Sequence, residues 1–346
     1  MVDVDALREE KRKVIERFGD WTDHNIHIAG DLYTISGDVV STKLRRIVQI
    51  VSDVAGEPLA NLRILDLACL EGLYAIEFAR QGAQAVGIEG RQANLEKARF
   101  VKDALGLDNL TLSQDDVRNL SPEKYGEFDV VLCLGILYHL DAPDVFQFVE
   151  NIARVTRRFA VLDTYVSTAS KVAHPYDGRS YWGRKVFEHS PADSADARLS
   201  RLWNSLDNPK SLWITRRSLY NLLADCGFTT VYECHVPADL HKPADRVTLL
   251  AIKGKRQTLL STPKVNALPA TAWPEDFKPR LSQEQDPRVR ISKRLSHMVP
   301  SVVKRPVKAA LQAVGVLPKP PQQQQKHGWW PDWRAESQPP RTGKKR

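Results

Sequence analysis

Two acids that a ligand could contact, Asp66 and Glu89, belong to two short apolar runs: Asp66 lies within the first run, and Glu89 ends the second. The first run, 64–68, predicts a buried parallel strand, and it is followed by a turn of small residues that closes at Gly72. Residues 73–79 have a helical pattern, and the second run, 85–88, predicts another strand. Small residues let the backbone approach a ligand, and a carboxylate at a strand end can accept both hydroxyls of a ribose. We therefore predict a nucleotide-binding βαβ unit, the alternative being a βαβ unit without a ligand in which Glu89 is only a solvated strand end.

The sequence of the turn after the first strand distinguishes between two possible classes of ligand. A dinucleotide favours G-x-G-x-x-G, whereas this turn reads Ala68-Cys69-Leu70-Glu71-Gly72, and Glu71 would repel a pyrophosphate. A nicotinamide-dependent oxidoreductase is thereby disfavoured. Residues 66–72 instead resemble motif I, D-x-G-C-G-x-G, of class I S-adenosylmethionine-dependent methyltransferases, with Ala68 and Leu70 in usual glycine positions. The resemblance implies S-adenosylmethionine, whose sulfonium and ammonium groups suit nearby acids.

Strands and helices alternate around this unit. Apolar periodicity predicts helices at 5–19, 40–54, 92–105 and 142–154, and strands at 109–113, 128–135 and 159–165. A helix within 211–228 and closing strands at 229–236 and 246–253 follow. This alternation predicts an α/β fold with a doubly wound, Rossmann-like sheet. The resemblance implies the seven-stranded methyltransferase sheet with one antiparallel strand.

The expected organisation has three parts. Residues 1–57 form an N-terminal helical segment, in which residues 21–34 are either a lid over the site or an ordinary packed loop. Residues 58–253 form the methyltransferase domain, with an aromatic-rich insertion at 167–210 where a substrate cap could sit. Residues 254–346 form a basic tail that we expect to be largely disordered, with an amphipathic segment at 288–316.

Charge is distributed unevenly along the chain. Residues 254–346 hold 19 Lys and Arg against 6 Asp and Glu, a balance of +13, whereas the whole chain of 346 residues carries +8 and the preceding part therefore −5. The tail could contact an anionic membrane surface or RNA, or pack on its own domain. No run of eighteen apolar residues is present, and the four cysteines lack metal-ligand spacing. We expect a cytoplasmic protein with reduced thiols and no metal site, with peripheral contact to the inner membrane face as an open alternative.

The resemblance also implies site residues. It covers motif I, the ribose acid Glu89, an adenine-side acid at Asp115 or Asp116, and the strand that leads to Tyr138 and His139. Gly135 to His139 and parts of 24–34 are similar to tRNA wobble-uridine carboxymethyltransferases and their relatives. The residues expected at the cofactor are Asp66, Ala68, Cys69, Leu70, Glu71, Gly72, Glu89, Gly90, Asp115, Asp116, Val117, Leu134 and Gly135.

The expected reaction is transfer of a methyl group to an acceptor held in line with the sulfur. A hydroxyl acceptor must lose its proton, and His139 is the first candidate base, unless it is a structural ring at the strand end. Tyr138 and His24 are further candidates for contact with the acceptor. We predict O-methylation of a small molecule, a sugar or a lipid-linked acceptor. The alternatives are a tRNA-modifying methyltransferase and a non-catalytic scaffold with the same fold.

Overall fold

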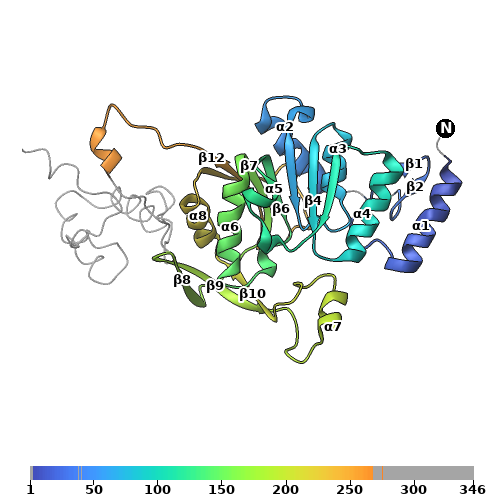
Figure 1. Cartoon of the computed structure of the whole chain (residues 1–346). Helices are drawn as coiled ribbons and strands as arrows, with labels where there is room; N and C mark the ends of the chain where they lie inside the picture. Colours follow the sequence, from blue (N-terminus) through green and yellow to red (C-terminus); the bar gives the residue numbers. More distant parts are fainter. Residues whose placement is uncertain (1–2, 38, 40, 268–274, 276–346) are drawn as a thin grey trace, which may run out of the picture. The chain divides into compact units, whose positions relative to one another are not determined.

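A seven-stranded sheet forms the centre of the computed structural model, in the order β11-β12-β7-β6-β3-β4-β5 (Figure 1). The strands are β3 (Arg63–Leu67), β4 (Gln84–Glu89), β5 (Leu110–Gln114), β6 (Phe128–Leu134), β7 (Thr156–Tyr165), β11 (Phe228–Glu233) and β12 (Arg246–Lys253). Only β12 runs against its neighbours, because it pairs antiparallel with both β7 and β11 while the other pairs are parallel. The predicted Rossmann-like methyltransferase sheet with one antiparallel strand is confirmed.

The structure describes residues 3–267, except 38 and 40, together with Glu275, and these residues belong to one unit that spans Met1–Glu275. The expected amphipathic segment at 288–316 and most of the basic tail lie outside the described residues. Within the described range, residues 254–262 form no helix or strand, and a short 3₁₀-helix follows at Pro263–Ala267.

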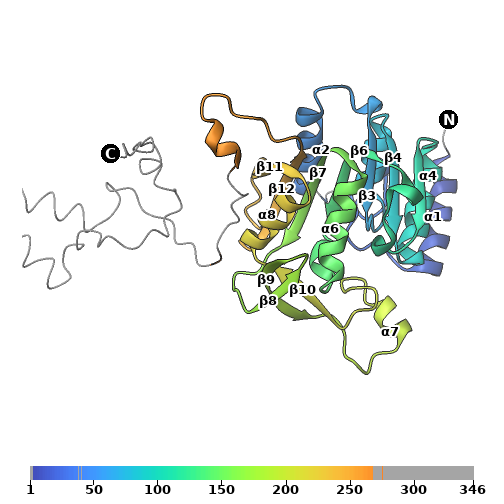
Figure 2. The ribbon, with the colours of Figure 1, turned by 60° about the vertical axis from the view of Figure 1, so that its left-hand side comes forward.

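Helices cover both faces of the sheet (Figures 1 and 2). Helices α2 (Thr42–Ala55) and α3 (Leu73–Arg80) contribute to the core on one face, which α4 (Gln92–Leu105) also joins. Helices α6 (Asp144–Val155) and α8 (Arg216–Asp225) contribute to the core on the other face. The short helices are η1 (Leu59–Asn61), η2 (Val117–Asn119), α5 (Pro122–Tyr125) and η3 (Leu137–His139).

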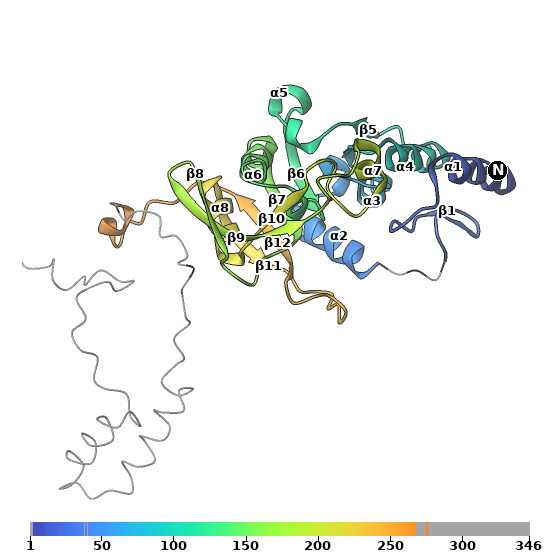
Figure 3. The ribbon, with the colours of Figure 1, turned by 90° about the horizontal axis from the view of Figure 1, so that it is seen from below.

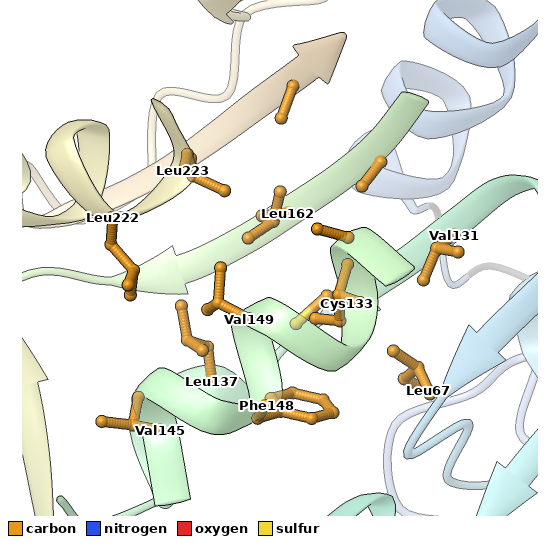
Figure 4. Close-up of a cluster of buried hydrophobic side chains, with 14 of the residues drawn as sticks. Leu67, Val131, Cys133, Leu137, Val145, Phe148, Val149, Leu162, Leu222 and Leu223 are labelled. Atoms are coloured by element: carbon orange, nitrogen blue, oxygen red, sulfur yellow. The ribbon is translucent and has the colours of Figure 1, made fainter. Parts of the chain in front are cut away.

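The core beneath α6 shows why the apolar runs form strands. Val131 and Cys133 of β6, Leu162 of β7, Val149 of α6 and Leu222 of α8 belong to one cluster of buried side chains (Figure 4). All of these side chains are buried. Strands covered by helices on both faces bury both sets of side chains, which explains why β6 and β7 read as continuous apolar runs rather than alternating ones.

The N-terminal segment is packed against the domain. Helix α1 (Val4–Phe18) lies beside α4 (Figures 1 and 3), and a small hairpin, β1 (His27–Ala29) with β2 (Leu32–Tyr33), follows it. Trp21 is buried and meets Phe100 of α4 edge to face, with ring centroids 5.8 Å apart. Trp21 is thus packed on the domain as the loop alternative expects, whereas the lid over the site stays a prediction for residues 21–34.

The insertion forms a second, three-stranded sheet at one end of the main sheet (Figure 2). Strands β8 (Val172–Tyr176) and β9 (Arg179–Phe187) form a hairpin, β10 (Lys210–Ile214) pairs with β9, and α7 (Ala195–Ser200) lies between them in sequence. The sequence predicted a helix within 211–228. The structure places that helix at 216–225 and gives residues 210–214 to a strand, because they pair with β9 across the insertion.

Candidate functional site

A cavity of about 710 Å³ opens where β3, β4, β6 and β7 end. Its walls also include residues of α2, of the insertion and of the segment 234–245 between β11 and β12. This volume falls in the range of small-molecule sites. The carboxyl ends of the strands in an open α/β sheet are the usual place for a ligand.

Three residues of the turn after β3 have a positive φ, although only one of them is a glycine. Ala68 and Leu70 have φ of 53° and 51°, and Gly72 has φ of 88°. The left-handed region costs an ordinary residue roughly 1–2 kcal/mol, so the turn holds Ala68 and Leu70 in a conformation that suits glycine. Ala68, Cys69 and Leu70 line the cavity. Gly72 instead sits behind them, where an added Cβ would lie 2.9 Å from the Ala98 side chain.

Glu89 ends β4 beside this turn and is buried at the cavity wall. Its carboxylate accepts the N–H groups of Leu70 at 2.9 Å and of Arg91 at 2.8 Å. Burial raises the pKa of Glu89, and these two donors offset part of that rise. Each carboxylate oxygen can accept more than one hydrogen bond, so Glu89 retains capacity for a ligand. Gly90 lines the cavity as well, and an added Cβ there would approach Leu206 to 2.6 Å.

Asp66 lies in β3 within the same wall and is buried. It accepts the N–H of Ala75 at 3.2 Å, in the first turn of α3. Burial raises the pKa of Asp66 to about 7, despite the Ala75 hydrogen bond and the nearby Lys43, which both lower it. A cationic ligand in the cavity would favour the ionised form of this carboxyl group.

Glu71 does not line the cavity, although the sequence placed it among the cofactor residues. Its fully buried carboxylate accepts the N–H groups of Thr22 at 2.8 Å and His24 at 3.1 Å. It also lies 3.3 Å from the Nζ of Lys97, which is equally buried. Glu71 therefore ties the N-terminal segment to α3 and α4 and does not face a ligand in the cavity.

The two acids after β5 face different ways. Asp115 lines the cavity, but its carboxylate is held by Lys124 at 2.6 Å, by Asn119 at 2.9 Å and by the hydroxyl of Tyr125. Burial alone would raise the pKa of Asp115, but these partners hold it at about 2. Asp116 faces an adjacent cavity and pairs with Arg118 at 2.5 Å. Val117 is buried and lines the main cavity.

His24 reaches the cavity from the N-terminal segment. Its Nδ1 accepts the N–H of Leu73 at 3.1 Å, at the start of α3. Burial, with a smaller contribution from Lys43, lowers the pKa of His24 to about 3, so the ring is neutral. Since Nδ1 is the acceptor, Nε2 carries the proton and can only donate. This geometry lets His24 donate a hydrogen bond to a ligand but does not let it act as a base.

His139 forms a pair with Glu188 that the sequence did not indicate. The Nδ1 of His139 lies 3.0 Å from Oε1 of Glu188, which comes from the insertion directly after β9. Burial would raise the pKa of Glu188, but hydrogen bonds, first that with His139 and then that from the N–H of Ser205, help to lower it overall. The carboxylate fixes the proton on Nδ1, and Nε2 of His139 has no protein partner among the described residues. Nε2 is therefore free to accept a proton.

Aromatic rings form one wall beside His139. Tyr165 stacks on Trp213 with centroids 4.9 Å apart and planes 13° apart, and Tyr138 meets Tyr165 edge to face at 5.0 Å. Burial raises the pKa of Tyr138 to about 12, so its hydroxyl is protonated at neutral pH. Leu134 and Gly135 at the end of β6 line the same cavity. Such flat faces suit the apolar side of a ring-shaped acceptor.

A group of cations surrounds Asp163 at the end of β7. This buried carboxylate lies 2.7 Å from Nε of Arg246, 3.7 Å from Nζ of Lys242 and 3.9 Å from Nζ of Lys43. The three cations all line the cavity. Burial would raise the pKa of Asp163, but the charges of Lys43 and Arg246 and the hydrogen bonds from Thr248 and Arg246 lower it overall.

Sequence reasoning found the residues at strand ends and missed those that reach the cavity from elsewhere. Asp163 carried the same signal as Asp66, an acid inside a buried apolar strand. Lys43 opens a predicted amphipathic helix, which is an ordinary place for a surface charge. Glu188 and Lys242 come from irregular segments, and no local pattern marks them.

Two absences apply to the described part of the chain. Within 3–267 and at Glu275, no three His, Cys, Asp or Glu side chains are grouped to hold a metal ion. No helix in that part is both long and apolar enough to cross a membrane. The cysteines Cys69, Cys133, Cys226 and Cys234 are all free, and the first two are buried.

Comparisons with known proteins point to one family. Residues 64–158 match the family model described as a methyltransferase domain. The ubiquinone biosynthesis O-methyltransferase of Acinetobacter baylyi is 33% identical over 85 residues, which are 25% of this chain and 36% of that protein. The protein of the same name from Pelagibacter ubique is 27% identical over 122 residues, 35% of this chain and 47% of that one. The chain thus spans between a third and a half of the length of these curated relatives.

Two solved structures of one protein are similar over more of the chain. The N-terminal domain of EvdMO1 in the presence of SAH and D-fucose has a TM-score of 0.55 at 26% identity, covering 71% of this chain and 97% of that one. The same domain with SAH bound has a TM-score of 0.56 with the same identity and coverage. The narrower resemblance to tRNA wobble-uridine carboxymethyltransferases stays a prediction. Residues 64–158 therefore carry a methyltransferase domain, in the Rossmann-like fold of the class I S-adenosylmethionine-dependent methyltransferases.

Proposed function

We propose that this chain is an S-adenosylmethionine-dependent O-methyltransferase whose acceptor is a small molecule with a ring, most simply a sugar. The observation that carries this proposal is one cavity that joins the turn of β3 and Glu89 to the His139–Glu188 pair. The turn of β3 and Glu89 suit a cationic nucleoside cofactor, and the His139–Glu188 pair supplies a base for a hydroxyl group. The SAH-bound EvdMO1 domain and the O-methyltransferase relatives support both halves.

The residues around the turn fit the cofactor. Glu89 keeps acceptor capacity for the ribose hydroxyls, and the left-handed turn from Ala68 to Leu70 leaves its backbone at the cavity wall. Asp66 and the Nε2–H of His24 would hold the methionine part, with Val117 and Asp115 beside the adenine. When bound, S-adenosylmethionine supplies an activated methyl group on a positively charged sulfur.

The His139–Glu188 pair would handle the proton of the acceptor. During methyl transfer to the acceptor oxygen, Nε2 of His139 would take up the proton that the hydroxyl group loses. Glu188 holds the ring through Nδ1 and stabilises the imidazolium that forms. The aromatic wall of Tyr138, Tyr165 and Trp213 would hold the acceptor ring close to this nitrogen, and such positioning can supply much of the rate.

Calorimetric titration of S-adenosylmethionine and S-adenosylhomocysteine (SAH) into the wild type, Glu89→Gln and Glu188→Gln tests the cofactor site. Glu89→Gln should weaken binding by about 10-fold or more, because hydrogen bonds to a charged group contribute about 1.5–3 kcal/mol. Glu188→Gln is the matched control, since it removes one carboxylate from the same cavity away from the turn, and it should leave SAH affinity unchanged. Absence of binding to the wild type would overturn the proposal and favour a scaffold.

Transfer of a labelled methyl group then tests the acceptor. D-fucose and related sugars come first, because D-fucose is present in the similar EvdMO1 structure. With an active acceptor, His139→Ala and Glu188→Gln should each lower turnover by about 10²–10⁴-fold. Full turnover by His139→Ala would remove the base role from this residue. Transfer to tRNA and to no sugar would favour the RNA-modifying alternative.

A further inference from the structure

We propose that the acceptor carries an anionic group, a phosphate or a carboxylate, and that four cations at one side of the cavity bind it. We call Lys43, Arg46, Lys242 and Arg246 the cation cluster; all four line the cavity. This inference rests on the proposed function and specifies its substrate class. The carboxylates that pair with the cluster are too few to neutralise its positive charge.

Three members of the cluster share a single carboxylate. Lys43, Lys242 and Arg246 each lie within 4.0 Å of Asp163, and none of them has another carboxylate within that distance among the described residues. Within 4.0 Å, one negative charge thus faces three positive ones. At longer range, Asp23 and Asp66 also attract Lys43, and Glu233 also attracts Lys242. Asp239 lines the same cavity but forms no ion pair within 4.0 Å with the cluster.

Arg46 adds a fourth charge with still fewer partners. The residue is 2% exposed, yet the one hydrogen bond that its guanidinium makes among the described residues goes to the carbonyl of Pro237, at 2.5 Å. Its Nε is buried with no partner, and no carboxylate of the described residues lies within 4.0 Å. Buried charges are normally paired, because desolvation without a partner is costly. A guanidinium has five donors in a planar fork that matches phosphate and carboxylate, so an anionic ligand is the natural missing partner.

The position of the cluster assigns the anion to the acceptor rather than to the cofactor. The turn and Glu89 belong to β3 and β4, whereas Arg246 begins β12, which β6 and β7 separate from β3 in the sheet. Lys242 precedes β12, and Arg46 bonds to Pro237 in the same segment. Only Lys43 lies near the cofactor side, 5.4 Å above the ring of Tyr74 in α3. The aromatic wall also meets the cluster, since the Arg246 guanidinium lies 5.0 Å above the Tyr165 ring. An acceptor whose ring lies on this wall would bring an attached phosphate or carboxylate to the cluster.

The test measures the melting temperature of the protein saturated with SAH, so that the carboxylate of the cofactor product already occupies its own position. The probes are inorganic phosphate, glucose 6-phosphate and glucuronate, with glucose as the neutral sugar and sodium chloride at equal ionic strength as the salt control. We expect at least one anion, at tenfold its Kd, to raise the melting temperature by about 3 °C, with no effect of glucose. Phosphate and glucuronate arms separate a phosphate from a carboxylate.

Variants connect the effect to the cluster. Arg46→Met should abolish the anion-dependent rise, and Arg46→Lys should keep part of it. Arg80→Met is the matched control, because this exposed arginine also bonds to a single carbonyl, that of His27 at 3.1 Å, but does not line the cavity. If Arg46→Met does not fold, Lys242→Gln removes a partly exposed member of the cluster and should weaken the rise.

Three results would overturn this inference. The first is no stabilisation of the SAH-saturated wild type by any anion beyond that of sodium chloride. The second is stabilisation that disappears once SAH is bound, which would assign the cluster to the cofactor carboxylate. The third is an equal anion effect in Arg46→Met and the wild type. Failure of the proposed function is separate, because it would appear as absence of SAH binding before any anion is added.

Discussion

Replacing Lys97 with methionine should destabilise the protein by about 3 kcal/mol, because it breaks a buried ion pair. The side chains of Lys97 and Glu71 are 1% and 0% exposed, and their charged atoms lie 3.3 Å apart. Removing one partner of such a pair typically costs about 3–5 kcal/mol, since the other charge stays buried. Glu71 keeps the backbone N–H groups of Thr22 and His24, which places the expected loss at the low end of that range.

Arg99→Met on the same helix is the matched control. Arg99 pairs with Glu96 at 2.6 Å, but these side chains are 41% and 27% exposed, so the pair should contribute less than about 1 kcal/mol. Urea unfolding followed by tryptophan fluorescence measures both variants. At a slope of about 2 kcal/mol per molar, Lys97→Met should lower the midpoint by roughly 1.5 M and Arg99→Met by less than 0.5 M.

The double variant Lys97→Met with Glu71→Gln separates loss of charge pairing from loss of packing. It should recover part of the stability, because no unpaired charge remains buried. Equal midpoints for Lys97→Met and Arg99→Met would refute the reasoning. The buried pair would then contribute no more than a surface pair, and Glu71 would hold the N-terminal segment by its backbone hydrogen bonds alone.

Further predictions concern the residues behind the cavity. The native pKa of His24, about 3, lies below the usual value, so only the unfolded chain gains a proton as the pH falls from about 6.5, and the folded protein loses stability. His24→Asn, which can still accept the N–H of Leu73, should reduce that loss of stability, measured as urea midpoints from pH 7 to pH 5. The native pKa of Asp66, about 7, lies above the usual value, so stability falls as pH rises from about 4 to 7. Asp66→Asn should raise the unfolding free energy of the ligand-free protein at pH 8 by up to about 4 kcal/mol and leave it nearly unchanged at pH 4, and an equal effect at both pH values would contradict the burial of an ionised acid. Gly72→Ala should lower the free energy of unfolding by about 1–3 kcal/mol, because φ is 88° at this position and the new Cβ would lie 2.9 Å from that of Ala98. A urea midpoint equal to that of the wild type would argue against this geometry of the turn.

The sequence predicted the main sheet well because its signals are local. Buried parallel strands appear as short apolar runs, and β3, β4, β5, β6 and β12 lie within two residues of the expected ranges. The insertion was harder, since β10 is recognisable only by its pairing with β9. One signal there was available, the Asp177-Gly178 turn between β8 and β9, where both residues have positive φ.

In the candidate site, too, the sequence predicted the residues with local signals and missed those that depend on contacts between distant segments. Residues near the ends of strands or just after them, such as Asp66, Glu89 and His139, reach the cavity as their position in the fold requires. Glu71 belongs to the same motif but turns away, because buried N–H groups of the N-terminal segment need an acceptor. Glu188 and Arg46 depend on contacts between segments more than forty residues apart, which no local spacing encodes.

The two sides of the cavity differ in their charged groups, and this difference fits the proposed reaction. Asp66 and Glu89 line the side where we propose that the cofactor binds, which we call the acidic side although Arg91 lines it too. Arg46 and Lys242 line the other, cationic side, together with Asp163 and Asp239. Methyl transfer turns a positive sulfur into a neutral one, so the acids lose part of their attraction for the cofactor once the reaction is complete. An anion on the acceptor keeps its charge through the same step. The acidic side would therefore favour substrate over product cofactor, whereas the cationic side would hold acceptor and methylated product alike, because methylation of a hydroxyl leaves the anionic group unchanged.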